Sequence, residues 1–490
     1  MTSPDSGSLQ GTAVRGGVAV IIGQVSRTLI QLVGLILLAR LLTPADFGLV
    51  AMVTSVIGVT SVLSDFGLSM AIMREAELPP SIRDALFYIN TVLALIAAAL
   101  VWAAAPLIAG FYHEPQLEAV ARWLAPSVFI AGLAPQYRAE LARKLKFGAL
   151  ASVDTIAQAV ALAAACIAAV RGAGYWAVVI QQATAAVVLV IFLVALSRYV
   201  PRTRPSLRGV KEHVSLGAAS LGVDLTNYAA VYAAPAAVGQ ALGAAAVGLY
   251  TRAFQLVAFP LVQLAGPLTR VVVPILAHVA DGPDLVAAAK RVQLAMAYAL
   301  LPLLAFIIVG GEDLVEILFG PDWRPSGQLA QILAVGGIFQ VLGYVNYWLF
   351  TRKGRLVLLW VLDGSVWIPI TLSYFIFNTR GATWVAGLYA ASLLMNWLMS
   401  TGVGLRMLGL PAMELLLPSV KRLVFLAPLV VVGLVVREVL DDNAWHAGWA
   451  LATASMSSLL VVAALMLVPT FRHELREFIG IFAGLRRRKL

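Results

Sequence analysis

Long apolar runs, separated by short polar seams, dominate the pattern of hydrophobic and polar positions along the chain. The runs are 20–28 residues long and rich in Ala, Leu and Val. A helix that crosses a bilayer needs about 20 mostly apolar residues, whereas a membrane β-barrel shows alternating segments of about ten residues. The pattern therefore predicts about fourteen membrane-spanning helices. They cover residues 16–41, 47–73, 84–112, 117–140, 148–170, 174–198, 212–240, 247–279, 289–311, 327–351, 356–378, 381–406, 419–439 and 447–469.

The composition supports an all-α polytopic membrane protein. The chain has 490 residues, of which 61% are hydrophobic and 12% charged, and its mean hydropathy is +0.89. Soluble domains carry about 25% charged residues, so an ordinary soluble core is excluded. The single cysteine, Cys166, lies in an Ala-rich run and is expected to be a small packing residue, because no disulfide can form within the chain.

The distribution of Lys and Arg predicts the orientation of the spans. With the N-terminus in the cytoplasm, 26 of the 35 Lys and Arg residues fall on the inner side and 6 on the outer side, as the positive-inside rule requires. Both termini are therefore expected in the cytoplasm, with the protein in the inner (cytoplasmic) membrane. The net charge of +10 then follows from topology and from the tail LRRRKL, which suits anionic lipid, and no nucleic-acid partner is needed.

A repeat divides the chain. The seam at residues 42–48 and the seam at 242–248 align at an offset of 200 residues, which places Gly48 on Gly248 and Leu49 on Leu249. Six predicted spans separate the two seams, so both face the outer side. Parallel repeats of this kind are a transporter architecture, with a binding cavity between the lobes near the midplane.

The predicted organisation is two parallel six-helix lobes plus two further helices. The expected parts are a cytoplasmic tail (1–15), an N-lobe (16–198), a cytoplasmic linker (199–211), a C-lobe (212–406), two extra helices (407–470) and a basic cytoplasmic tail (471–490).

Two ionisable residues lie deep in the predicted spans. Arg27 and Asp224 each sit ~16 Å from the start of their helix, near the bilayer centre. At the 200-residue offset Gln24 falls on Asp224 and Arg27 on Asn227, and Gln31 shares the face of Arg27. These five residues are the predicted lining of a central cavity, where a guanidinium suits a diphosphate or an acidic sugar. The alternative is an Arg27–Asp224 salt bridge that only holds the lobes together.

Other charged residues lie closer to the ends of the spans. For these, snorkelling or local pairing is favoured over transport, and they are kept as secondary candidates for the cavity. They are Asp65, Arg122, Arg270 and Asp363. Asp154, like Asp363, lies within two turns of the inner end of its predicted span.

Several stretches resemble one transporter family. They are LLARLLTPADFGLVAMVTSVIGVTSVLSDFGLSMAIM (37–73), ALFYINTVLALIAAAL (85–100), RAELARKLKF (138–147), GYWAVVIQQ (174–182) and GAAAVGLYTRAFQL with RVVVPIL (243–276). Over residues 15–410 the chain resembles the polysaccharide transporter family, the Wzx-type flippases of the multidrug/oligosaccharidyl-lipid/polysaccharide exporter superfamily.

The resemblance implies a function. It implies movement of a polyprenyl-diphosphate-linked oligosaccharide, a precursor of surface polysaccharide or lipopolysaccharide, to the outer leaflet by alternating access. Membrane lipid, this glycan, and the glycosyltransferases and polymerase of the same pathway are the implied partners. Such proteins often carry an aspartate before the second seam, but this chain has AAPAAVG at 233–239. Coupling to H⁺ or Na⁺ therefore stays open, and no cofactor is expected.

The sequence leaves two other functions to consider. A cation-coupled multidrug exporter of the same superfamily would have twelve spans and an acid-rich cavity. A membrane glycosyltransferase or polymerase would need a large outer loop or catalytic acids in the first outer loop, which holds only Asp46. The nucleotide-binding and hydrolase motifs are absent, and the five histidines are isolated, so neither an enzyme nor a metal site is expected.

Overall fold

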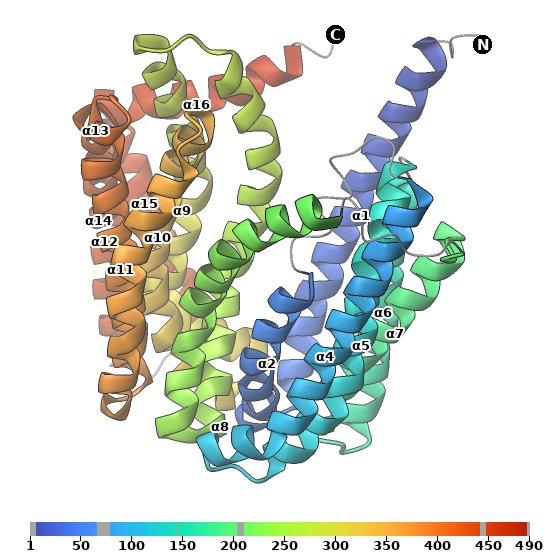
Figure 1. Cartoon of the computed structure of the whole chain (residues 1–490). Helices are drawn as coiled ribbons and strands as arrows, with labels where there is room; N and C mark the ends of the chain where they lie inside the picture. The colour runs from blue at the N-terminus through green and yellow to red at the C-terminus, as the bar shows by residue number, and fades with distance from the viewer. Residues whose placement is uncertain (1–5, 66–78, 145, 203–209, 442–446, 488–490) are drawn as a thin grey trace. The chain divides into compact units, whose positions relative to one another are not determined.

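The computed structural model describes residues 6–65, 79–144, 146–202, 210–441 and 447–487. Within these ranges nearly every residue is helical and none lies in a β-strand, as Figure 1 shows. A helix bonds all of its own backbone groups, which is the condition for crossing hydrocarbon. The predicted all-α fold class is confirmed.

The chain forms two compact units, residues Met1–Gly248 and Leu249–Leu490. The division falls inside one long helix, α8 (Val210–His278), whose backbone leaves helical geometry at Gly243, at a φ of 80°. The first part of α8 therefore belongs with the N-terminal unit. The predicted lobe boundaries stay predictions, and residues 203–209 of the predicted linker lie outside the described residues.

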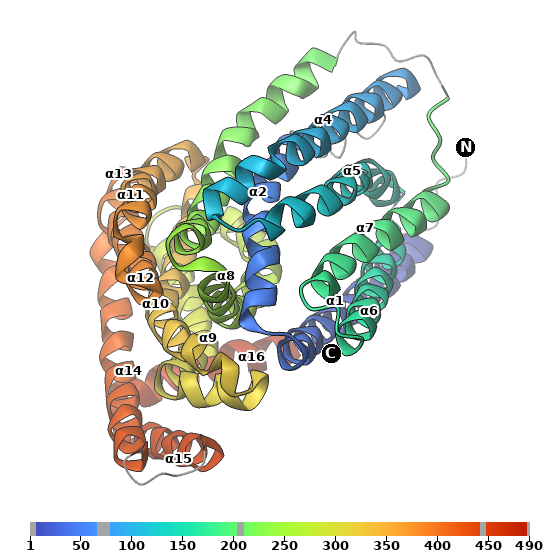
Figure 2. The same ribbon diagram turned by 90° about the horizontal axis from the view of Figure 1, so that it is seen from below.

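Unit 1 is built from helices that follow the predicted spans closely. They are α1 (Ser6–Leu41), α2 (Pro44–Asp65), α4 (Pro80–Tyr112), α5 (Gln116–Arg143), α6 (Phe147–Val170) and α7 (Trp176–Ser197), followed by the first part of α8. Figure 2 shows α4 beside α5, and α6 beside both α1 and α7.

A short capping motif separates α1 from α2. The Thr43 backbone N–H donates to Asp46 Oδ2 at 3.0 Å, and the Asp46 N–H donates to Thr43 Oγ1 at 3.3 Å. This reciprocal pair satisfies free N–H groups at the start of α2, as a capping box does. The seam at 42–48 is therefore a tight turn between two helices, as predicted.

Unit 2 continues α8 and adds a second set of helices. They are α9 (Pro283–Phe319), α10 (Arg324–Arg352), α11 (Leu356–Phe377), α12 (Ala382–Leu398), α13 (Leu405–Met407), α14 (Ala412–Asp441), α15 (Ala447–Leu465) and α16 (Pro469–Arg487). Two 3-10 turns, η1 (Pro321–Trp323) and η2 (Asn378–Arg380), and a π-helical segment, η3 (Met399–Gly404), connect them.

The predicted count of fourteen spans is not confirmed. Eleven helices in the described residues are long and apolar enough to cross a membrane, or twelve if a bent pair counts as one span. The predicted spans 212–240 and 247–279 lie in the single helix α8. The predicted span 47–73 is described only as far as Asp65, and its apolar described part, Pro44–Gly58, is short.

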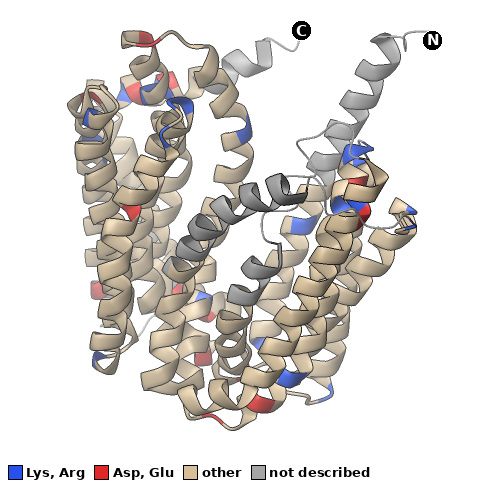
Figure 3. Cartoon of the chain, viewed as in Figure 1, with Lys and Arg blue, Asp and Glu red and all other residues tan. Residues whose placement is uncertain are grey.

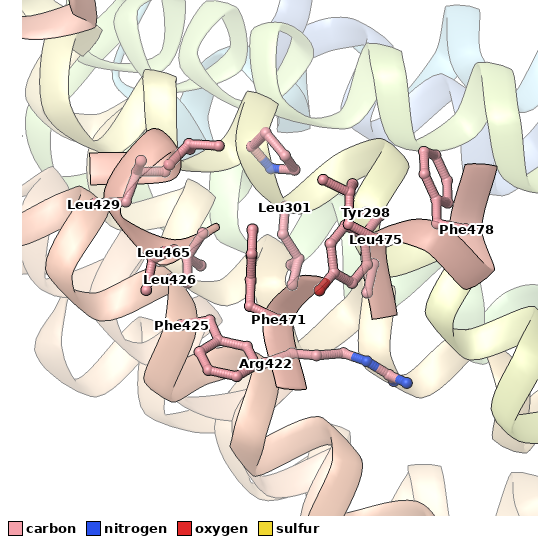
Figure 4. Close-up of a pocket in the computed structure, with 13 residues that line it drawn as sticks. Tyr298, Leu301, Arg422, Phe425, Leu426, Leu429, Leu465, Phe471, Leu475 and Phe478 are labelled. Atoms are coloured by element: carbon pink, nitrogen blue, oxygen red, sulfur yellow. The ribbon is translucent and has the colours of Figure 1, made fainter. Parts of the chain in front are cut away.

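The segment predicted as a basic tail at 471–490 is mostly the helix α16. It is bent by 103° from the end of α15, and Figure 1 shows it running across the end of unit 2. Phe471, Leu475 and Phe478 of α16 line a cavity of about 190 Å³ together with residues of α9, α14 and α15, among them Tyr298 (Figure 4). These three apolar residues follow the helical period, and the predicted place of the segment in the cytoplasm stays a prediction.

Most charged residues lie toward the helix ends in each unit, with long uncharged stretches between them (Figure 3). One example is Asp281, between α8 and α9. It pairs with Arg352 at 3.3 Å and Lys353 at 3.0 Å, and the hydrogen bond from Lys353 lowers the pKa of Asp281. This placement is typical of helices whose middle sections lie in lipid.

A buried ionic contact joins α14 to α9. Arg437 donates to Asp313 at 3.0 Å and to Glu312 at 3.0 Å, and its side chain is 11% exposed, with that of Asp313 at 2%. Nearby, Arg324 pairs with Glu316 at 3.4 Å but is 49% exposed. The two arginines share neighbouring acids and differ mainly in burial.

We predict that Arg437→Gln lowers the free energy of unfolding by about 3 kcal/mol, because a buried carboxylate loses its partner. The matched change Arg324→Gln should cost less than about 1 kcal/mol, because its pair is exposed. Thermal unfolding of the purified protein in detergent measures both. Equal losses of stability for the two variants would contradict the assignment.

Candidate functional site

Arg27 of α1 reaches toward α6. Its Nη1 atom lies 3.9 Å from Asp154 Oδ2, and its side chain is 45% exposed. The distance is at the outer limit of an ion pair, so this contact is loose. Within the described part of the chain, Arg27 is thus a cation with one distant anionic partner, and nearly half of its side chain is accessible.

Asp154 makes its main contact with α5. Arg138 Nη1 donates to Asp154 Oδ2 at 3.2 Å, and Arg138 Nη2 bonds the other carboxylate oxygen. Two parallel N–H···O bonds between a guanidinium and a carboxylate are the strong, directional form of this pair. One carboxylate from α6 therefore faces two guanidinium groups, from α1 and α5, and the cluster carries a surplus positive charge.

Close packing of α1 on α6 fixes this geometry one turn earlier in both helices. A Cβ atom placed on Gly23 would lie 2.6 Å from the Cβ of Ala151. The Thr155 hydroxyl donates to Ala151 O at 2.8 Å and lies 3.5 Å from Gly23 O. Since Arg27 follows Gly23 by one turn and Asp154 follows Ala151 by three residues, the two side chains meet.

The other predicted cavity residues divide into two groups. Gln24 is exposed and Gln31 is half-buried, and both make contacts of their own. Asp224 and Asn227 belong to the helix α8, but the structure does not describe their side chains. The predicted pair between Arg27 and Asp224 therefore stays a prediction, while Asp154 is a partner that the sequence reasoning did not assign to Arg27.

The secondary candidates lie at separate places. Arg122 pairs with Glu118 of its own helix at 2.7 Å and lies over the ring of Trp102. In unit 2, Asp363 of α11 accepts a hydrogen bond from Asn396 of α12 at 2.8 Å.

The structure describes the side chain of only one of the two remaining candidates. Arg270 is exposed on α8 in unit 2, and the side chain of Asp65 is outside the described residues. Of the secondary set, none with a described side chain in unit 1 reaches the Arg27 cluster.

The charge pattern predicted Arg138 only as one of the inner-side cations, and it predicted only snorkelling or a local partner for Asp154. The signal was present, because Arg138 opens the stretch RAELARKLKF and Asp154 is the one acid in α6. Their proximity depends on tertiary packing of α5 against α6, which the sequence alone does not specify. Among the described residues, no group of three or more His, Cys, Asp or Glu side chains is placed to hold a metal ion.

Comparison with known families decides the class of this protein. Residues 37–328, more than half of the chain, match the model of the family described as "Polysaccharide biosynthesis protein". The chain belongs to this family. The resemblance to polysaccharide transporters that the sequence motifs indicated is thereby confirmed.

Individual members of the family are similar at low identity. The chain is 27% identical over 375 residues to the teichuronic acid biosynthesis protein TuaB of Bacillus subtilis strain 168, covering 76% of this chain and 78% of that one. It is 24% identical to the lipopolysaccharide biosynthesis protein WzxC of Escherichia coli K12, covering 66% of each chain.

Solved structures share the fold. A structure titled "Lipid II flippase MurJ, inward closed conformation" matches with a TM-score of 0.71 at 11% identity, over 93% of this chain and 98% of that chain. An inward-facing MATE family transporter matches with a TM-score of 0.58 at 16% identity, over 81% of this chain and 94% of that chain. This family member is thus a multi-pass membrane protein with a transporter fold.

Proposed function

We propose that this protein is a flippase for a polyprenyl-diphosphate-linked oligosaccharide, a precursor of a cell-surface polysaccharide or lipopolysaccharide. The observation that carries the proposal is the surplus guanidinium of Arg27, partly exposed on a helix of a polysaccharide biosynthesis family member. A diphosphate is the anionic part of such a lipid, and guanidinium binds phosphate oxygens in a bidentate fashion. The shared fold with a lipid flippase is consistent with this substrate class.

The proposal includes a mechanism and an orientation. The substrate head group enters from the cytoplasmic side, binds Arg27 and leaves on the outer side by alternating access, without chemical change. Both termini lie in the cytoplasm, where the glycosyltransferases of the same pathway make the substrate. A polymerase acts on it after transfer.

A cation-coupled drug exporter is the second candidate, supported by the shared fold with MATE transporters. It is the weaker candidate because the cluster described in unit 1 has more cations than acids, which does not favour a cationic drug.

We predict that Arg27→Ala abolishes surface display of the glycan while the membrane level of the protein stays near wild type. Arg27→Lys should keep part of the activity, because it keeps the charge and loses the planar fork. The measurement is surface glycan in a strain lacking the natural gene and carrying each variant, with the membrane protein quantified.

Arg122→Ala is the matched control, because its guanidinium is engaged with Glu118 and Trp102 away from the cluster. It should display glycan normally. Normal display by Arg27→Ala at equal protein level would contradict the proposed function.

We predict that reporter domains fused after Leu490 are active only in the cytoplasm, because of the charge distribution. A reporter placed in the turn at 112–117 should be active only outside the cytoplasm. Outside activity of the C-terminal fusion would reverse the proposed orientation.

A further inference from the structure

The Arg27 cluster is asymmetric, and the asymmetry suggests separate roles for its two arginines. Arg138 engages both oxygens of Asp154, whereas Arg27 approaches one of them at 3.9 Å. Asp154 is the more buried member, at 19% exposed against 45% for Arg27. Asp154 is thus held mainly by Arg138, and the contact between Arg27 and Asp154 is the easier of the two to break.

We propose that Arg138 is a positioning residue that occupies Asp154 and so keeps Arg27 available to a phosphate group. This inference rests on the proposed function and deepens it. A phosphate that binds Arg27 breaks only the loose contact, because Asp154 stays neutralised by its bidentate partner. Without Arg138, Asp154 would turn to Arg27, since no third cation among the described residues lies within ion-pair distance, and would compete with the phosphate.

The test measures binding of inorganic pyrophosphate to the purified full-length protein in lipid nanodiscs. Arg138→Gln should weaken pyrophosphate binding about five- to tenfold. The double variant Arg138→Gln with Asp154→Asn should restore it, because the competing carboxylate is gone. A residue that merely supported the fold would not be rescued by removing its partner's charge.

Two matched controls separate this effect from general electrostatics. Lys144→Gln removes one positive charge at the end of α5, where Lys144 pairs with Glu140 at 3.0 Å. This variant should bind pyrophosphate as wild type does. Arg138→Gln with Glu140→Gln has the same net charge as the rescued double variant and should stay weak. Equal rescue by Glu140→Gln, or unchanged binding in Arg138→Gln, would overturn the inference.

The outcome also separates this inference from the proposed function. If Arg27→Ala loses pyrophosphate binding while Arg138→Gln binds normally, only the positioning role fails. If Arg27→Ala binds pyrophosphate as wild type does, the proposed head-group site itself fails.

A second, independent observation concerns the two repeated seams, which contact each other inside unit 1. A Cβ atom on Gly48 would lie 1.7 Å from the carbonyl oxygen of Ala244, and one on Gly248 would lie 1.8 Å from the carbonyl oxygen of Pro44. At the 200-residue offset these are the same contact with the roles exchanged. Such reciprocity is the mark of a two-fold relation, here between the residues around Gly48 and those around Gly248.

The contact continues between α2, α4 and the first part of α8. The Tyr112 hydroxyl lies 3.0 Å from Ser55 Oγ. The Tyr228 hydroxyl lies 3.0 Å from the carbonyl oxygen of Thr54 and 3.1 Å from that of Ser55. A Cβ atom on Gly58 would lie 1.9 Å from the Tyr228 oxygen. These contacts consist of backbone packing and neutral hydrogen bonds, which are individually weak.

We infer that this α2–α8 contact closes the transport pathway on the outer side and separates in each cycle. It rests on the proposed function for the existence of a cycle. Glycine backbones that touch directly leave no gap between the two segments. Contacts of this kind form and break more readily than a buried ion pair, which suits a closure that must open repeatedly.

The test uses a thiol reporter, Ser55→Cys, in a chain whose only natural cysteine is changed by Cys166→Ala. In intact cells, a membrane-impermeant maleimide should label this reporter slowly, because Ser55 is 6% exposed. Gly48→Val should raise the labelling rate at least fivefold, since its side chain cannot fit against Ala244. Tyr228→Phe, which removes cross-contact hydrogen bonds without adding volume, should raise it about twofold.

Gly110→Val is the matched control, because a Cβ atom there meets nothing within 4 Å. It should label like the parent reporter. Unchanged labelling in both Gly48→Val and Tyr228→Phe would overturn the closure, as would an equal increase in Gly110→Val. If Gly48→Val labels faster but displays glycan normally, the α2–α8 contact does not lie on the transport pathway. That result would also overturn the inference.

Discussion

A charged side chain on an apolar helix needs an opposite charge, a polar partner or water, and this requirement shapes both units. Asp313 of α9 is almost fully buried and is matched by Arg437 of α14. Asp154 of α6 is matched by Arg138 of α5. Because each partner comes from a different helix, the ion pairs also fix which helices pack together, and removing one member takes a close counter-charge away from the other in a low-dielectric region.

The same requirement distinguishes a structural charge from a functional one. Arg422 of α14 bonds Gln293 at 2.9 Å and lies 3.6 Å from Glu474, with 6% of its side chain exposed. Among the described residues, Arg27 has one carboxylate nearby, at 3.9 Å and already held by another arginine, and its side chain is far more exposed. A buried arginine held between close partners stabilises the fold, whereas one that is loosely paired and accessible can exchange its partner for a ligand. That difference is why unit 1 holds the proposed head-group site.

The sequence allowed the helices to be predicted well, because long apolar runs have few alternatives in a chain of this composition. The turn at 42–48, the boundaries of α6 and α11 and the family resemblance all followed from local pattern. The pairing of Arg27 with Asp154 did not, since it depends on the packing of Gly23 against Ala151, more than a hundred residues apart. Ion-pair choice among several intramembrane charges is decided by such distant packing, and local depth alone pointed to Asp224, whose side chain is outside the described residues.

The C-terminal segment shows the same limit in another form. Charge alone indicated a basic tail, but two acids of α16 pair with other helices of unit 2. Glu474 lies 2.8 Å from Lys421 of α14, and Glu477 lies 3.6 Å from Arg291 of α9. Arg472 and Arg476 of the same helix are exposed. Glu474 is buried in its pairing with α14, whereas the two cations stay exposed. The exposed surface of α16 is therefore more basic than its sequence, because packing buries one of its acids and leaves these two cations accessible.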